Sequence, residues 1–259
     1  MTRTILLATT ALVALAFPAF ADGKSGTRLT GLGDAGYTYF DADGGSLDNF
    51  HANGSALWSW SNKWNAQGNF TFDSFRDDPF GISAWKLGGA GFWRDANEGL
   101  LGGEIHYQAI DALFSVDGVD IRGRGELFLS DITLGAHLGY STYDDLDGWQ
   151  LGVYGSYYAS PQLGLRLGLD YGNWDADIAS PFNDFDTWSL DGEVEYLFPD
   201  CDTGIYAGLG FGASDDGTAG DSDFWRIGAG IRVHFGTDGS LMKRNREEPL
   251  RPVRTNFSF

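Results

Sequence analysis

Carboxylates and guanidinium groups occur at alternate positions in several stretches of this sequence. The positions between them are mostly apolar residues or glycine, which is the period of two expected of a β-strand with unlike faces. The charged positions are Asp120, Arg122, Arg124, Glu126, Arg166, Asp170, Asp191, Glu193, Glu195, Arg226 and Arg232. Charges of both signs on the inner face of a barrel could form a selective constriction in a water-filled pore, or could pair and fill the interior. The sequence leaves these two interpretations open.

Glycines separate the two most strongly charged stretches near the end of the chain. The segment 205–213 sets Gly208, Gly210 and Gly212 on one face, and it lies between the carboxylates of 191–195 and the arginines of 226–232. Glycines on the inner face leave room for long arginine side chains to reach the carboxylates. We therefore predict a charge network across the last four strands, 163–171 to 222–235, with the charges of 120–126 on the other side of the lumen.

The alternating pattern continues through most of the chain and predicts an all-β fold. Its clearest example is 222–235, SDFWRIGAGIRVHF, in which one face is apolar and the other carries glycine and cations. We predict about twelve strands, including Leu29–Phe40 and Ile205–Ala213, in an up-and-down antiparallel transmembrane β-barrel. Short turns should alternate with longer Asp/Gly-rich loops, such as 41–44, 144–148 and 215–217.

The first 21 residues have the form of a secretory signal peptide. Arg3 precedes an apolar run from Ile5 to Phe17, and Ala19-Phe20-Ala21 forms an A-x-A cleavage site. A membrane-anchoring helix is disfavoured, because the run is shorter than the about 20 residues that a bilayer requires. We predict cleavage of 1–21, a barrel domain over 22–235 and a C-terminal tail over 236–259.

Three features favour an apolar face that points outward into lipid. The apolar positions of the later strands carry no charge, which would cost about 2–4 kcal/mol at the membrane midplane. The inner face is rich in glycine, which suits a crowded lumen. Aromatic residues gather near the strand ends, as in the two interfacial girdles of membrane barrels. They are Tyr39, Trp149, Tyr171, Trp188 and Trp225 at one end, and Trp60, Trp64, Phe198 and Phe235 at the other. A periplasmic β-sandwich is the alternative architecture.

The signal peptide, the alternation and the closing pattern of the last strand resemble Gram-negative outer-membrane β-barrel proteins. The resemblance covers nearly the whole mature chain and implies that Gly230, Val233 and Phe235 belong to the terminal signal read by the barrel-assembly machinery. Such proteins often end at this aromatic residue, whereas this chain continues to Phe259. The ending at Phe259 could itself be the assembly signal, so either Phe235 or Phe259 could end the last strand. Pro249 and Pro252 favour a periplasmic tail.

Several functional classes are disfavoured. The formal net charge of −19 argues against nucleic-acid binding. Cys201 has no second cysteine to pair with and lacks the neighbours of a zinc site. The acidic stretches do not have the spacing of a calcium loop, so we interpret them as solvated turns and expect no metal or cofactor.

Catalysis is also disfavoured. A lipid-cleaving serine activated by histidine would have to meet the membrane. The histidines His51, His106, His137 and His234 instead alternate onto the lumen face where they can be placed.

The sequence thus predicts an exported outer-membrane protein that acts as a narrow passive channel for small solutes. A non-conducting structural or surface-interaction barrel is the alternative. The expected partners are outer-membrane lipid, lipopolysaccharide and the assembly machinery. The sequence does not identify a solute.

Overall fold

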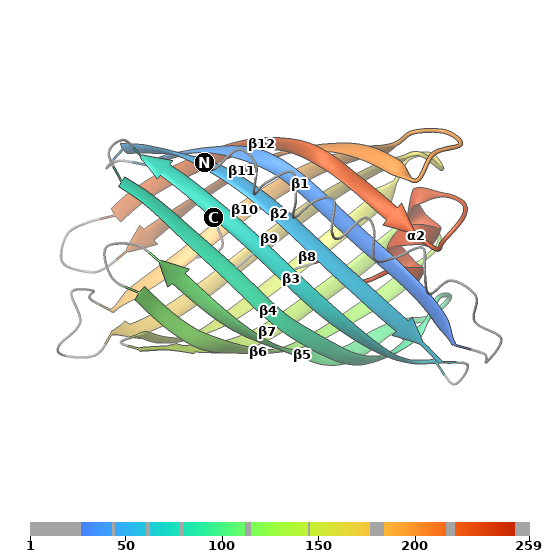
Figure 1. Ribbon diagram of the computed structural model, residues 1–259, viewed down its shortest axis with the longest axis horizontal. Coiled ribbons are helices and arrows are strands. Elements are labelled where there is room, and N and C mark those ends of the chain that lie inside the picture. The colour runs from blue at the N-terminus through green and yellow to red at the C-terminus, as the bar shows by residue number, and fades with distance from the viewer. Residues whose placement is uncertain are drawn as a thin grey trace.

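The computed structural model is a closed antiparallel β-barrel (Figure 1). It describes residues 27–42, 45–60, 63–77, 80–111, 115–144, 146–176, 184–215 and 221–251. The strands are β1 (Arg28–Ala42), β2 (Gly45–Ser59), β3 (Trp64–Asp77), β4 (Phe80–Asp95), β5 (Gly99–Asp111), β6 (Ser115–Leu129), β7 (Ile132–Tyr143), β8 (Leu146–Tyr158), β9 (Leu163–Ala176), β10 (Phe185–Leu197), β11 (Thr203–Asp215) and β12 (Asp221–Phe235). The fold class predicted from the sequence is confirmed.

Pairing between the first and last strands closes the barrel. Gly31 lies opposite Phe235, and the ladder continues to Ala42 opposite Phe224. The strand that ends at Phe235 is therefore the closing strand. Phe259 and the predicted signal peptide over 1–21 lie outside the described residues. We call the end of the barrel where β1 begins and β12 ends the turn end, and the opposite end the loop end.

Alternation decides which side chains face out. Leu101, Leu127 and Ile121 are more than half exposed on the outer surface. The side chains at the alternate positions of these strands face the lumen, where Arg122 and Glu126 are buried. Aromatic rings pair on neighbouring strands, with centroids 5.4 Å apart for both Tyr39–Trp225 and Trp149–Tyr171. The outer surface is thus an apolar band with aromatic residues near its edges.

The strands extend further toward the loop end than the sequence pattern predicted. β1 continues through Asp41 to Ala42, and β11 continues to Asp215. Since β8 begins at Leu146, all three acidic stretches predicted as loops lie partly within strands. The prediction placed these strand ends too early because it relied on apolar alternation, whereas backbone pairing such as Asp41 opposite Trp225 does not require apolar side chains.

The chain turns at Gly236 into a short helix after the last strand. Gly236 has a φ of +79°, and a Cβ there would lie 2.8 Å from the carbonyl oxygen of Leu29, so the turn favours glycine. Helix α2 (Leu241–Glu247) begins after Ser240, whose side chain accepts a hydrogen bond from the backbone N–H of Lys243. The helix lies at the turn end of the barrel (Figure 1). Among the described residues, no helix is long and apolar enough to cross a membrane.

Candidate lumen site

The inward glycines of β11 make room for an ion pair between its two neighbours. Arg226 of β12 donates from Nε and Nη2 to Asp191 of β10 at 2.7–2.9 Å. A Cβ at Gly210 would lie 2.2 Å from the Asp191 carboxylate and 2.7 Å from Nε of Arg226. The pair therefore occupies the space that a side chain on β11 would fill.

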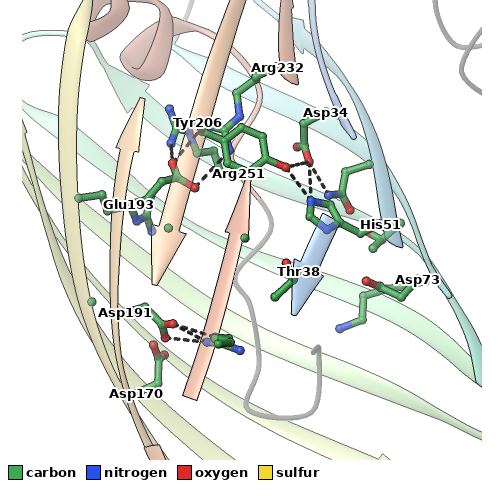
Figure 2. Close-up of a pocket in the computed structure, with 18 of the residues that line it drawn as sticks. Asp34, Thr38, His51, Asp73, Asp170, Asp191, Glu193, Tyr206, Arg232 and Arg251 are labelled. Carbon is green, nitrogen blue, oxygen red and sulfur yellow. Dashed lines mark hydrogen bonds and ion pairs between the residues drawn. The ribbon is translucent and has the colours of Figure 1, made fainter. Parts of the chain in front are cut away.

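A second pair crosses β11 closer to the turn end. Arg232 lies 3.2 Å from a carboxylate oxygen of Glu193 and 2.8 Å from one of Glu195. Its guanidinium carbon is 4.4 Å from the ring centroid of Tyr206. Arg251, from the segment after β12, also pairs with Glu193 (Figure 2) and with Glu195. Two guanidinium groups thus share two carboxylates.

The charges of 120–126 pair locally. Arg124 lies 2.7 Å from Glu126, and Arg122 lies 3.6 Å from Glu104 of β5. Asp120 accepts a hydrogen bond from Lys86 of β4 at 2.6 Å. These side chains face the lumen but form no ion pair, within the described chain, with the charges of β9 to β12.

Two residues of β9 that were predicted to join the network, Arg166 and Asp170, form no ion pair with the described charges of β10 and β12. Asp170 pairs with His137 at 3.0 Å. Arg166 forms no ion pair with any described residue, and its guanidinium carbon lies 4.0 Å from the ring centroid of Tyr154. The structure therefore brings together the charges of β10 and β12 and leaves Arg166 outside their ion pairs.

The sequence interpretation did not single out a polar group on β1, β2 and β11. Nε2 of His51 lies 2.6 Å from the hydroxyl of Tyr206 and 3.7 Å from Asp34, and Asn53 donates to Asp34 at 2.8 Å (Figure 2). Asp34, His51 and Asn53 lie on the lumen face of their strands, and the alternation alone could have identified them. Their grouping depends on the closure of β1 onto β12, which brings Tyr206 of β11 close.

The four histidines all face the lumen. His51 and His137 are engaged as described, His106 lies 3.3 Å from the amide of Asn69, and His234 lies between Glu195 and Glu248. Among the described residues, no group of three His, Cys, Asp or Glu side chains is arranged to hold a metal ion.

The charged residues surround a cavity of about 180 Å³ in the lumen. Its acidic lining includes Asp34, Asp73, Asp170, Asp191 and Glu193. The basic lining residues are Lys86, Arg166, Arg226, Arg232 and Arg251, of which Figure 2 labels the last two. The cavity thus has charged side chains of both signs in its lining.

The turn end of the lumen is filled by the segment after β12. Leu250 packs in an apolar cluster with lumen-facing residues of β2, β4, β5 and β6, namely Leu57, Ala90, Phe92, Leu100 and Phe128. Its backbone exchanges two hydrogen bonds with the side-chain amide of Gln67, at 2.6 and 2.9 Å. Leu241 forms a second cluster with Tyr158 and Leu197. We call residues 237–251 the C-terminal plug.

Arginine side chains fix the plug on several sides of the barrel. Arg246 donates to the carbonyl oxygens of Leu129, Ser130 and Ile132 at 2.8–3.0 Å. From the wall, Arg94 donates to the carbonyl oxygen of Glu248 at 2.8 Å. Arg124 similarly donates to the carbonyl oxygen of Arg251. These contacts hold the described end of the plug inside the lumen.

A buried acid joins the plug to the closing strand. Oε2 of Glu248 lies 2.5 Å from Nδ1 of His234, and both side chains are buried. Burial raises the pKa of Glu248 above its ordinary value of 4.5, although the contact with His234 acts in the opposite direction. The docked plug thus favours the protonated acid.

Comparison with solved structures identifies similar barrels. An outer membrane channel from Pseudomonas putida F1 has a TM-score of 0.56 and 12% identity, over 84% of this chain and 99% of that chain. The KdgM porin in complex with disordered oligogalacturonate has a TM-score of 0.50 and 9% identity, over 77% and 98%. No protein-family model matches the sequence, and no curated protein matches it. The similarity establishes the fold of an outer-membrane β-barrel.

Proposed function

We propose that this protein is an outer-membrane channel for small solutes, in which the C-terminal plug restricts passage at the turn end. The observation that carries the proposal is the charged cavity inside a closed barrel. Charged rings in a narrow lumen select solutes by charge and size. Such a channel would be passive, because the barrel itself supplies no source of energy.

The proposal includes the cellular setting. The exposed apolar band would contact outer-membrane lipid, with lipopolysaccharide around its outer edge. The segment 1–21 would direct export as a signal peptide and would then be cleaved. The barrel-assembly machinery would read the end of β12, including Gly230, Val233 and Phe235. The turn end would then face the periplasm.

Conductance with a covalent blocker tests the channel proposal. Thr38 lines the cavity, so a thiol-reactive cation should reduce the current through Thr38→Cys protein in planar bilayers. The native Cys201 is exposed, so the wild-type chain treated with the same reagent is the matched control. We expect stepwise currents that the reagent lowers only in the variant. Currents that the reagent leaves unchanged in both proteins would contradict passage through this cavity.

The plug favours a second candidate, a non-conducting structural barrel. Its apolar cluster and its arginine contacts close the turn end with buried groups. If neither the full chain nor a chain that ends at Gly236 gives stepwise currents, this second function replaces the first.

A further inference from the structure

One of the cations that line the lumen cavity forms no ion pair with any described residue. Of the five Lys and Arg side chains lining the cavity, four form ion pairs: Lys86, Arg226, Arg232 and Arg251. Arg166 is the exception within the described part of the chain. This exception is notable because desolvated charges in proteins are usually paired.

The register explains why Arg166 remains unpaired. Its cross-strand neighbour on β10 is Glu193, which also faces the lumen. Glu193 is instead engaged by Arg232 at 3.2 Å and by Arg251 at 2.8 Å. On the other side of Arg166, β8 offers only Ser156. The plug, through Arg251, thus competes for the carboxylate that would neutralise Arg166.

Guanidinium groups outnumber carboxylates in the group of charges that includes Arg166 and the plug residue Arg251. The guanidinium groups are those of Arg124, Arg166, Arg232 and Arg251, and the carboxylates are those of Glu126, Glu193 and Glu195. Both Arg124 and Arg166 lie over the ring of Tyr154, at 5.3 and 4.0 Å. One positive charge is left without a counter-charge among these seven groups.

The contact with Tyr154 positions the guanidinium of Arg166. Its guanidinium carbon lies 4.0 Å from the ring centroid of Tyr154, and the N–H donors of a guanidinium lie in its own plane. Arg166 also lines the cavity. A planar fork of donors in a confined space matches the two oxygens of a carboxylate.

We propose that Arg166 binds the carboxylate group of a small solute that carries a single negative charge. The single charge follows from the one guanidinium without an ion pair, because a dianion such as hydrogen phosphate would bring a second negative charge that this site does not compensate. The cavity of about 180 Å³ restricts the solute to a small molecule. This inference rests on the proposed function only in requiring that solute can enter the cavity.

Nuclear magnetic resonance of the full chain in detergent micelles tests the assignment. Arginine labelled with ¹⁵N gives one Nε–Hε signal per side chain, and Arg166→Gln identifies the signal of Arg166 by its loss. Sodium acetate is titrated against sodium chloride at constant ionic strength. We expect a saturable shift of the Arg166 signal with acetate. The signal of Arg226, which already binds Asp191 through two nitrogens, is the matched control and should not shift.

Variants and a second anion sharpen the test. Arg166→Lys keeps the charge but loses the planar fork of donors. Its affinity for acetate, measured from the resonance of acetate itself, should fall at least about tenfold. Equal shifts of the Arg166 and Arg226 signals would overturn the proposal, as would tighter binding of inorganic phosphate than of acetate.

A truncated chain tests for an internal occupant. If removal of 252–259 alone shifts the Arg166 signal in the absence of acetate, the chain itself occupies the site and the proposal fails. Specific acetate binding by a barrel that gives no current would support this site while contradicting the channel proposal.

Discussion

The two halves of the lumen differ in what occupies them. At the turn end, Leu250 and its apolar cluster exclude water, and Glu195 is only 2% exposed. Toward the loop end, the side chain of Asp191 is 30% exposed beside the cavity although it pairs with Arg226. Both halves are built from the same alternation of inward and outward residues. The difference therefore comes from a segment that lies outside the strands.

This contrast changes the role of the charges. In the filled half, each charged group needs an ion pair or hydrogen bonds, as Arg246 finds with backbone carbonyl oxygens, because an isolated buried charge is strongly destabilising. In the open half, water shares the solvation, so an ion pair contributes less. Similar residues can therefore be structural at one end and available to solute at the other.

Removing a carboxylate from the filled half should have the largest effect. Glu195→Gln leaves Arg232 and Arg251 with less compensating charge, and we expect a loss of about 3–5 kcal/mol in the free energy of unfolding. Asp191→Asn is the matched change in the open half and should cost about 1 kcal/mol. Denaturant unfolding in lipid vesicles measures both. Equal losses would show that the two halves do not differ in solvation.

Truncating the apolar anchor of the plug should release it while the barrel stays folded. Leu250→Ala removes most of a side chain from the buried cluster, at a cost of about 2–5 kcal/mol in local stability. Trypsin should then cleave after Lys243 at least about tenfold faster, because cleavage requires local opening. Leu209→Ala, on the exposed outer surface, is the control. An unchanged cleavage rate in Leu250→Ala would contradict anchoring by this residue.

Filling the space on β11 should disturb the open half by a smaller amount. In Gly210→Ala the new methyl group would lie 2.2 Å from Asp191, so Arg226 and Asp191 must separate. We expect a loss of about 1–3 kcal/mol in the free energy of unfolding. Gly91→Ala is the matched control, since its Cβ meets nothing within 4 Å. A similar loss in the control would remove the steric explanation.

The smallest expected effect is a pH dependence of plug docking. Because burial raises the pKa of Glu248 in the docked state, its protonation stabilises docking. This stabilisation is complete below the ordinary pKa of 4.5 and is lost as the pH rises through the raised value. Open probability in planar bilayers should therefore increase from acidic toward neutral pH. Glu248→Gln cannot ionise, so a slope as steep as that of the wild type would exclude this group.

The strands and the lumen charges were predictable because both follow from alternation. The pairing of Arg226 and Arg232 with carboxylates across the glycines of β11 follows from strand order and side-chain length. The plug was not predictable in this way, since Leu250 and Arg251 have no periodic pattern that indicates their partners. Their positions depend on contacts with strands more than a hundred residues away, such as the bond between Leu250 and Gln67.

The most direct test of the division between the two halves compares conductance with and without the plug. A chain that ends at Gly236 keeps the complete ladder from Gly31 opposite Phe235 onward, so the barrel should still close. A difference in electrophoretic mobility between heated and unheated samples verifies that the truncated barrel folds. We expect single-channel conductance in planar bilayers several-fold higher than that of the full chain. Equal conductance in the two folded proteins would contradict closure of the turn end by the C-terminal plug.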